Sequence, residues 1–229
     1  GVDFVAPITF DKVLSMLSAR EFLAHLQQNL RMRGLVTGPD FALGRNREGK
    51  VKALISLGEA MGFSLKVVHA LVDGAQPIRS TTIRQTLAKG DVRCVSEFLG
   101  HDFVLTGIVV KGAKRGRTLG FPTANLAIPS GMAIPGDGIY ATWAWVSGCY
   151  YMSATSIGTS PTFGNNERTV EAFIIDYEGD LYDQKIRLEF VHRLRDEERY
   201  ETVQSLKNQI NRDVNQTRTI LKTSKPNVG

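Results

Sequence analysis

The stretch VLTGIVVKGAKRGRTLGFPTANL, residues 104–126, marks a change in the character of the sequence. From here on, short runs rich in β-branched and aromatic residues alternate with clusters of Gly, Pro and Asp, which is typical of short strands joined by turns. The later runs are GIYATWAWVSG (138–148), YYMSATSIG (150–158), VEAFIIDYEG (170–179) and KIRLEFVHRL (185–194). This pattern predicts a small antiparallel β-barrel. Apolar residues at helical spacing from about 201 to 221 predict one helix that closes it.

The N-terminal part has a different pattern. Residues 2–6 are predicted to form a strand, and the apolar residues between 22 and 30 have the spacing of a helix. A short apolar run at 34–37 and two further helical segments, around 51–61 and 80–89, follow. Alternating strands and helices predict an α/β layer.

Composition sets broad limits on the class of protein. The chain has 229 residues, 42% hydrophobic and 22% charged, which suits one large or two modest globular domains. No apolar run approaches the roughly 18 to 20 residues of a membrane span, and the beginning lacks the pattern of a secretory signal. We therefore expect no membrane partner and a cytoplasmic location. Cys94 and Cys149 lie far apart without metal-ligand spacing, and both are predicted to be buried thiols.

Basic residues gather in the glycine-rich part of the stretch 104–126, whereas the rest of the net charge of +5 is spread along the chain. Glycines permit a close approach of the backbone to an oxygen-rich ligand, and the amides of such a loop can point at phosphate. The predicted phosphate-binding residues of this stretch are Gly112, Lys114, Gly116, Arg117 and Thr118. The spacing is not that of a Walker loop, and taken alone a basic, glycine-rich turn is also compatible with a solvated hairpin.

The sequence FPTAN (121–125) follows directly. If this segment is extended, Thr123 and Asn125 project to the same side. A hydroxyl and an amide carbonyl are oxygen ligands suited to Mg²⁺, which binds through few protein groups together with substrate phosphates. Both residues are therefore candidates for binding metal and ATP. The alternative is a strand Thr followed by an Asn that caps the next turn.

Glu171 is an isolated carboxylate in the apolar run VEAFII. An ionised group in such a strand is costly, so the fold keeps it either for a structural hydrogen bond or for proton transfer. A kinase for a hydroxyl substrate needs a base, a metal and a phosphate site. Glu171 is the candidate base for that chemistry.

The motifs GAKRGRTLGFPTANL, SIGTSPTFG, VEAFIIDYEGDLY and LRDEERY together resemble the bacterial riboflavin kinase family in order and spacing. The resemblance implies a six-stranded antiparallel barrel that makes FMN from riboflavin and ATP with Mg²⁺. It implies that Thr123 and Asn125 bind ATP and magnesium and that Glu171 is the general base on the ribityl hydroxyl. Phe173 departs from the His that the family commonly has two residues after this Glu, which puts a second polar contact in doubt.

LRDEERY (194–200) resembles the family's flap over the flavin. The residues carried over as flavin contacts are Phe121, Arg195 and Glu197. The resemblance implies a kinase domain over residues 104–222, followed by a tail at 223–229.

The first 103 residues resemble the FAD synthetase, or FMN adenylyltransferase, module of bacterial bifunctional enzymes, which is a Rossmann-type nucleotidyltransferase. The motifs that carry this resemblance are GPDFALGRNREG (38–49) and IRSTTIR (78–84). They imply nucleotide binding by Ser80, Thr81 and Arg84 and flavin binding by Asp40 and Phe41. STTIR on its own is also an ordinary helix start.

Two features depart from the adenylyltransferase pattern. Arg79 replaces the usual first Ser of the second motif, and the sequence contains no HxGH-type phosphate motif. We therefore expect an incomplete adenylyltransferase module with little FAD synthesis.

Two other classes of protein remain open. The first is a flavin- or nucleotide-binding regulatory module without catalysis, against which the combination of a base with metal ligands argues. The second is a nucleic-acid-binding barrel, suggested by the pI of about 9.3. Its weakness is that the aromatic residues of 143–151 are not interleaved with basic ones, so the stacking platform for single strands is missing. We expect small-molecule substrates and no nucleic acid, and the sequence does not predict the oligomeric state.

Overall fold

The computed structural model describes residues 2–69, 71–73, 76–112, 115–159 and 168–226. The chain forms two compact units, Gly1–Pro77 and Ile78–Gly229, and each is described by itself.

The first unit is a small α/β assembly. Strands β1 (Gly34–Thr37) and β4 (Ser64–Val67) pair in parallel, and α3 (Val51–Met61) connects them. Its core is formed by Leu23, Leu54 and Phe63. The other elements are α1 (Lys12–Met16), α2 (Ala19–Leu30), β2 (Ala42–Leu43), a 3₁₀ turn (Arg45–Arg47), β3 (Gly49–Lys50), β5 (Val72–Asp73) and β6 (Gln76–Pro77). This is the α/β layer that the sequence predicts.

The strand expected at residues 2–6 is wrong. These residues have no regular structure, and Phe4 and Val5 are 91% and 84% exposed. A strand is stabilised by its neighbours, and within the described part of the chain none pairs with this segment.

The second unit is built on a closed, six-stranded antiparallel barrel with the order β10-β11-β8-β7-β12-β9. Its strands are β7 (Phe103–Val110), β8 (Ala124–Ala127), β9 (Gly138–Val146), β10 (Cys149–Thr159), β11 (Arg168–Ile174) and β12 (Lys185–Arg195). The predicted barrel is confirmed. Alternate side chains of each strand fill its interior, which holds a large apolar cluster that includes Leu105, Val170 and Leu188.

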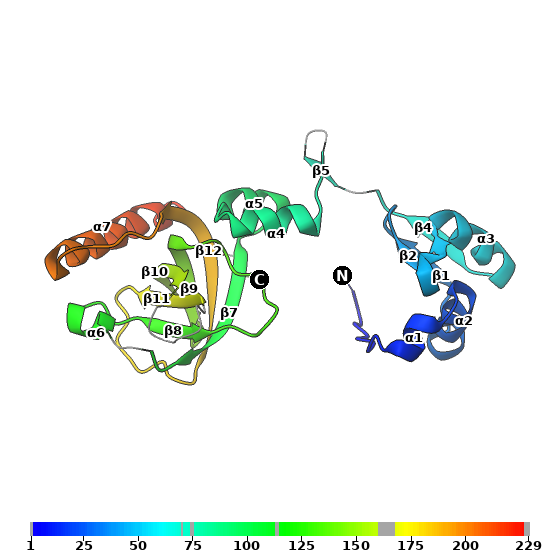
Figure 1. Ribbon diagram of the computed structural model, residues 1–229, viewed down its shortest axis with the longest axis horizontal. Coiled ribbons are helices and arrows are strands. Elements are labelled where there is room, and N and C mark those ends of the chain that lie inside the picture. Colours follow the sequence, from blue (N-terminus) through cyan, green and yellow to red (C-terminus); the bar gives the residue numbers. More distant parts are fainter. Residues whose placement is uncertain (1, 70, 74–75, 113–114, 160–167, 227–229) are drawn as a thin grey trace. The chain divides into compact units, whose positions relative to one another are not determined.

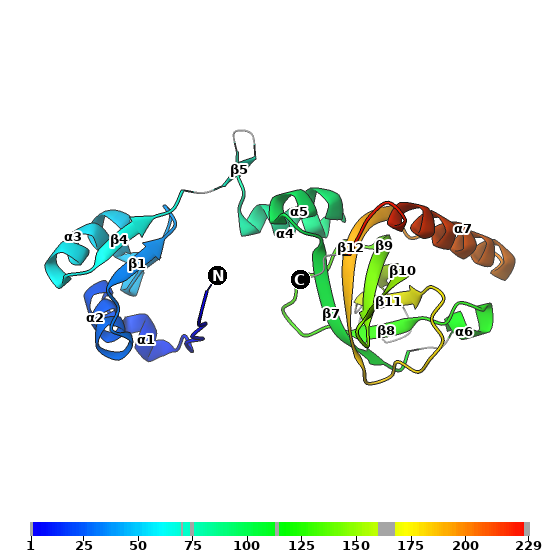
Figure 2. The same cartoon turned by 180° about the vertical axis from the view of Figure 1, so that it is seen from behind.

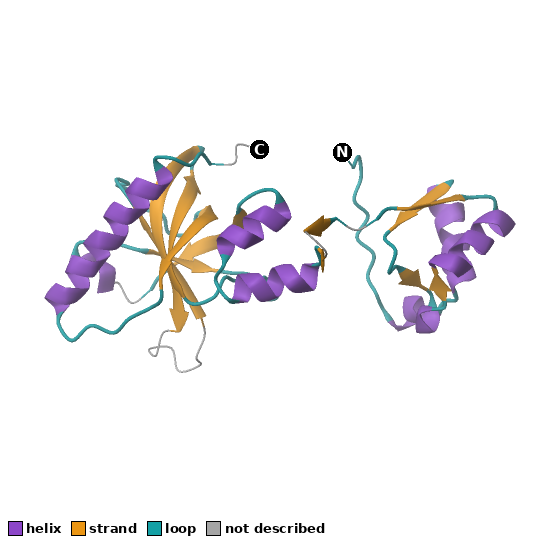
Figure 3. Ribbon diagram, turned by 90° about the horizontal axis from the view of Figure 1, so that it is seen from above, coloured by secondary structure: helices purple, strands orange, loops and turns teal. Residues whose placement is uncertain are grey.

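Helices lie outside this ring of strands, as Figure 3 shows. The long helix α7 (Val203–Leu221) packs on β9, β10 and β12, with Leu221 against Ala141 and Trp143 (Figures 1 and 2). Thr202 caps its first turn through a reciprocal hydrogen-bond pair with Ser205. The predicted C-terminal helix is confirmed.

Helices α4 (Ser80–Ala88) and α5 (Val92–Leu99) belong to the barrel unit, because Leu87, Val92 and Val95 lie in its core. The compact unit thus begins before the predicted module boundary at 103/104. The limits of the catalytic modules, 1–103 and 104–222 with a tail at 223–229, stay a prediction.

Two local expectations differ from the structure. The glycine-rich stretch contains a short helix, α6 (Arg115–Leu119), where a turn was expected, and residues 113–114 lie outside the described residues. The prediction of two buried thiols is also wrong. Cys149 is exposed because it follows the turn between β9 and β10, where Ser147 and Gly148 have positive φ, and Cys94 is half-buried.

Candidate active site

Strands β8 and β11 pair in the barrel wall, and their register determines which candidate residues face the barrel interior and which face outward. Asn125 lies opposite Glu171 in the antiparallel register, and Ala124 lies opposite Ala172. Successive side chains of a strand point to opposite faces. Both alanines point into the barrel and are buried, so Asn125 and Glu171 lie on the outer face, where both are half-buried.

A hydrogen bond connects Thr123 with Glu171. The Thr123 hydroxyl donates to Oε2 of Glu171 over 3.1 Å, although the residues are 48 positions apart. Asn125 lies close by, against Gly112, where a side chain at residue 112 would come within 2.4 Å of the Asn125 amide. Gly112 therefore permits the close approach of its loop to Asn125.

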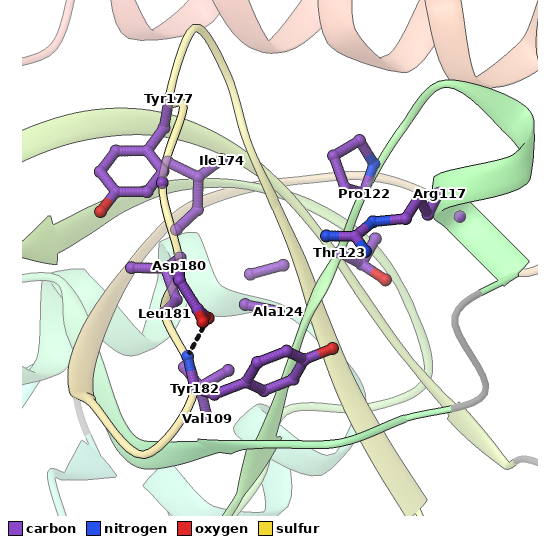
Figure 4. Close-up of a pocket in the computed structure, with 13 residues that line it drawn as sticks. Val109, Arg117, Pro122, Thr123, Ala124, Ile174, Tyr177, Asp180, Leu181 and Tyr182 are labelled. Atoms are coloured by element: carbon purple, nitrogen blue, oxygen red, sulfur yellow. Dashed lines mark hydrogen bonds between the residues drawn. The ribbon is translucent and has the colours of Figure 1, made fainter.

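An inner cavity of about 510 Å³ is lined in part by Val109, Ala124 and Ala172, whose side chains belong to the barrel core. Figure 4 shows Arg117, Pro122 and Thr123 on one side of it and Tyr177 and Asp180 on the other. Its lining residues are Val109, Gly116, Arg117, Pro122, Thr123, Ala124, Ala172, Ile174, Tyr177, Gly179, Asp180, Leu181 and Tyr182. A basic side chain and a glycine on one wall, with tyrosines on the other, suit a ligand that has both phosphates and an aromatic ring.

An outer cavity of about 270 Å³ lies on the opposite face of the same wall. Its lining residues are Gly116, Leu119, Phe121, Thr123, Ile139, Ala154, Ser156, Glu171, Phe173, Arg195, Glu197, Glu198, Tyr200, Leu206, Ile210 and Asp213. Gly116 and Thr123 line both cavities. Thr123 thus belongs to both cavities, and its hydrogen-bond partner Glu171 belongs to the outer one.

Aromatic and apolar groups form part of the outer cavity. The rings of Phe121 and Phe173 meet edge to face, with centroids 5.4 Å apart. Leu206 and Ile210 of α7 also line the cavity. This surface suits a flat, largely apolar ring system.

Carboxylates define the electrostatics of the outer cavity. Burial raises the pKa of Glu197, although a hydrogen bond from Ser156 (Oγ to Oε1, 3.2 Å) opposes this change. The nearby charges of Asp137 and Glu171 also raise the pKa of Glu197. Arg195 is the basic side chain that lines this cavity, and it is paired with Asp213.

Comparisons with known proteins identify the family. The riboflavin kinase family model matches residues 99–221, and the FAD synthetase model matches residues 1–82. The chain belongs to the riboflavin kinase family. It is 34% identical over 228 residues to the bifunctional riboflavin kinase/FMN adenylyltransferase of Escherichia coli (strain K12), covering 99% of this chain and 72% of that protein.

Two further matches agree with this family. The enzyme of the same name from Bacillus subtilis (strain 168) is 31% identical over 217 residues, which cover 93% of this chain and 68% of that protein. A crystal structure of a protein named macrolide-efflux protein from Streptococcus pneumoniae matches with a TM-score of 0.83 and 29% identity, over 91% of this chain and 67% of that one. That name describes the other protein. In the part of this chain that the structure describes, none of the helices has the length and apolar character needed to cross a bilayer.

Most of the predicted barrel residues of this riboflavin kinase family member come together. Those that line the inner cavity are Gly116, Arg117 and Thr123. Those that line the outer cavity are Gly116, Phe121, Thr123, Glu171, Arg195 and Glu197. Gly112, Thr118 and Asn125 line neither cavity, although Asn125 lies opposite Glu171 in the register and Gly112 lies against Asn125. Lys114 lies outside the described residues.

The predicted residues of the adenylyltransferase module lie elsewhere. Ser80, Thr81 and Arg84 are exposed on the first turns of α4 and line neither cavity. Asp40 and Phe41 belong to the other compact unit, where Phe41 is 40% exposed. The roles of these residues stay predictions.

Sequence reasoning missed several residues that line the cavities. Tyr177, Asp180 and Tyr182 of the inner cavity lie within VEAFIIDYEGDLY, one of the motifs that carry the family resemblance, so their aromatic and acidic side chains were the available signal. Tyr200 of the outer cavity ends the motif LRDEERY, so its aromatic ring was a signal of the same kind. Asp213 had no comparable signal, because polar residues of a helix are usually solvated.

Proposed function

We propose that this chain is a riboflavin kinase that transfers the γ-phosphate of ATP to the 5′-hydroxyl of riboflavin and gives FMN. The observation that carries the proposal is the Thr123–Glu171 hydrogen bond, whose donor Thr123 belongs to two cavities with different linings. Phosphoryl transfer needs a nucleotide and an acceptor hydroxyl held in line, with a base beside the hydroxyl. Two cavities that share Thr123, whose hydroxyl donates to the Glu171 carboxylate, suit this requirement.

The inner cavity is assigned to ATP. Arg117 and the backbone around Gly116 would hold the phosphates, and the tyrosine side of the cavity would take the base and sugar. The outer cavity is assigned to riboflavin, with the edge-to-face pair Phe121–Phe173 against the ring system.

Glu171 is assigned as the general base. In this arrangement it accepts the proton of the ribityl 5′-hydroxyl as that oxygen bonds to the γ-phosphorus and the bond to the β-phosphate oxygen breaks, with ADP as the leaving group. The Thr123 hydroxyl donates to one carboxylate oxygen and so orients the carboxylate.

Mg²⁺ fits the oxygen donors on this wall. The hydrogen bond to Glu171 uses the proton of the Thr123 hydroxyl and leaves its lone pairs for a cation, and Asn125, which lies opposite Glu171 in the register, has an amide oxygen as a second donor atom. A bound Mg²⁺ would neutralise charge on the β- and γ-phosphates. Thr123 and Asn125 are the residues that would hold it.

Glu171→Gln tests the proposal. Glutamine preserves shape but cannot accept the proton, so FMN formation should fall by about 10² to 10⁴-fold. Binding of riboflavin, followed by quenching of its fluorescence, and binding of ADP should stay close to wild type.

Glu97→Gln is the matched control, because Glu97 is exposed on α5 and forms a surface ion pair with Arg93 at 4.0 Å. It should leave turnover unchanged. Near-wild-type turnover of the Glu171→Gln variant would make Glu171 a structural residue. A wild-type chain that binds flavin and ATP without forming FMN would support the non-catalytic regulatory module instead.

A further inference from the structure

The segment that connects β12 to α7, residues 196–202, forms part of the outer cavity. Its residues Glu197, Glu198 and Tyr200 line that cavity. The segment has no regular secondary structure, so side-chain contacts must hold it in place.

One buried ion pair lies at the beginning of the segment. Arg195, the last residue of β12, donates from Nε to Oδ1 of Asp213 over 2.9 Å and from Nη2 to Oδ2 over 2.7 Å. Gln209 donates a further hydrogen bond to Oδ1 of Asp213 over 2.9 Å. The Arg195 and Asp213 side chains are only 18% and 5% exposed. Such a paired, bidentate contact is geometrically specific and little screened by solvent.

The same guanidinium also contacts the segment itself. Nη1 of Arg195 donates to the carbonyl of Asp196 over 2.8 Å, and its Cζ lies 5.9 Å from the centroid of the Tyr200 ring. The hydrogen bonds to Asp213 and to the Asp196 carbonyl thus use three of the five N–H groups of Arg195. Arg195 therefore connects α7 with the segment that lines the cavity.

Glu197 fixes the middle of the segment on β10. Ser156 donates a hydrogen bond to its carboxylate, and the carboxylate fills the space above Gly158. A side chain at residue 158 would begin only 2.0 Å from Oε2 of Glu197. Gly158 therefore makes room for this contact.

We propose that Asp213 is a positioning residue: through Arg195 it holds residues 196–202 against the outer cavity, and it thereby sets the affinity for the flavin. The inference rests on the proposed assignment of that cavity to riboflavin. Asp213 itself lies in the lining of the cavity, and its contact with residues 196–202 runs through Arg195, so the flavin affinity depends on the order that the pair imposes before the ligand binds.

A second ion pair of α7 supplies a matched control. Arg218 forms two hydrogen bonds of 2.7 Å with Asp176, so this pair also joins α7 to the barrel with bidentate geometry. It is more exposed, with 38% and 70% for the two side chains, and neither residue lines either cavity. Loss of this pair removes a contact of the same kind without touching residues 196–202.

The experiment compares Asp213→Asn with Asp176→Asn. Removing one partner of a buried, hydrogen-bonded charge pair is strongly disruptive, so we expect Asp213→Asn to raise the KM for riboflavin by about tenfold or more while the KM for ATP stays within about twofold. In the flavin-free chain, trypsin should cleave faster after Arg199, which is exposed within the segment. Asp176→Asn should change neither quantity.

Arg195→Lys is a second variant of the same ion pair, and it tests the inference if Asp213→Asn does not fold. It keeps the charge but not the two-pronged geometry, and it should give the same pattern at smaller amplitude. Wild-type KM values and wild-type cleavage after Arg199 in both Asp213→Asn and Arg195→Lys would overturn the inference, as would equal effects of Asp213→Asn and Asp176→Asn. A wild-type chain without kinase activity would refute the proposed function, whereas the cleavage measurement would still test the positioning.

Discussion

The barrel unit and the N-terminal unit differ in how firmly they fix their side chains. In the barrel unit, six strands close into a ring with a large cluster of buried residues, to which α4 and α5 also contribute, whereas the described buried cluster of the N-terminal unit consists of Leu23, Leu54 and Phe63. The described strands of the N-terminal unit form only two-stranded sheets. A closed barrel leaves no edge free and fixes the register of every strand.

This structural difference explains why the candidate catalytic residues lie close together in the barrel. Register alone brings Asn125 opposite Glu171, and the hydrogen bond from Thr123 follows from the same pairing. In the N-terminal unit, Asp40 and Phe41 lie in a turn outside any long strand. Residues held by a rigid scaffold can keep the precise geometry that catalysis needs.

Among substitutions that compare the two units, the largest losses of ligand affinity are expected in the barrel wall. Thr123→Ala and Asn125→Ala should each weaken ATP·Mg²⁺ by about 10- to 100-fold, because a hydrogen bond or contact to a charged group contributes about 1.5–3 kcal/mol. Riboflavin binding without nucleotide should change little. A magnesium titration of FMN formation measures the effect.

Asn211→Ala, an exposed position on α7, is the control for general damage. An unchanged magnesium dependence in both Thr123→Ala and Asn125→Ala, with folding verified by circular dichroism, would remove these residues from the metal site.

Core substitutions compare the stability of the two units directly. Leu105 in the barrel and Leu54 in the N-terminal unit are both completely buried, and Leu→Ala at such sites costs about 2–5 kcal/mol. Leu54→Ala should remove hydrogen-exchange protection from residues 19–67 and leave FMN formation at wild-type level. Leu105→Ala should lower protection throughout the barrel and reduce FMN formation at elevated temperature. If Leu54→Ala also abolished FMN formation, the two units would not be independent.

A smaller effect is expected from pH at the cavity rim. Burial raises the pKa of Glu197, so its ionised form is disfavoured in the folded state. Below the ordinary carboxyl pKa, Glu197 is protonated in both the folded and unfolded states and costs nothing. As the pH rises through the ordinary and then the raised pKa, the unfolded state loses its proton first and stability falls.

Glu197→Gln removes this ionisation while keeping an acceptor for Ser156. The variant should therefore melt slightly above wild type at neutral pH and at the same temperature as wild type in acid. Thermal melts at both pH values check the sign, and a lower melting temperature of the variant at neutral pH would contradict it.

Local sequence pattern was enough to predict the barrel and α7, whereas the metal and base roles of Thr123, Asn125 and Glu171 stay predictions. The barrel and α7 depend on strand alternation and helical spacing, which neighbouring residues determine. The strand expected at residues 2–6 failed because strand formation depends on a partner. The helix α6 was not predicted because the glycines of this stretch are typical of a turn.

The Arg195–Asp213 pair could not be predicted from pattern. Its two residues are 18 positions apart and belong to a strand and a helix, and only the packing of α7 on the barrel brings them together. Asp213 in the sequence NRDVNQ reads as a solvated helix residue, yet it is almost completely buried. Long-range contacts of this kind determine the shape of the outer cavity.

The product formed by the wild-type chain shows directly which of the two reactions the molecule catalyses. Incubation with riboflavin, ATP and Mg²⁺ should give FMN with one ADP per FMN, because the barrel holds both cavities and the candidate base. Incubation of FMN with ATP and Mg²⁺ should give FAD only near background, because the sequence has no HxGH-type motif to stabilise adenylyl transfer. Absence of FMN in the first reaction would contradict the assignment of riboflavin kinase activity to the barrel. Robust FAD synthesis in the second would contradict the prediction that the chain has little adenylyltransferase activity.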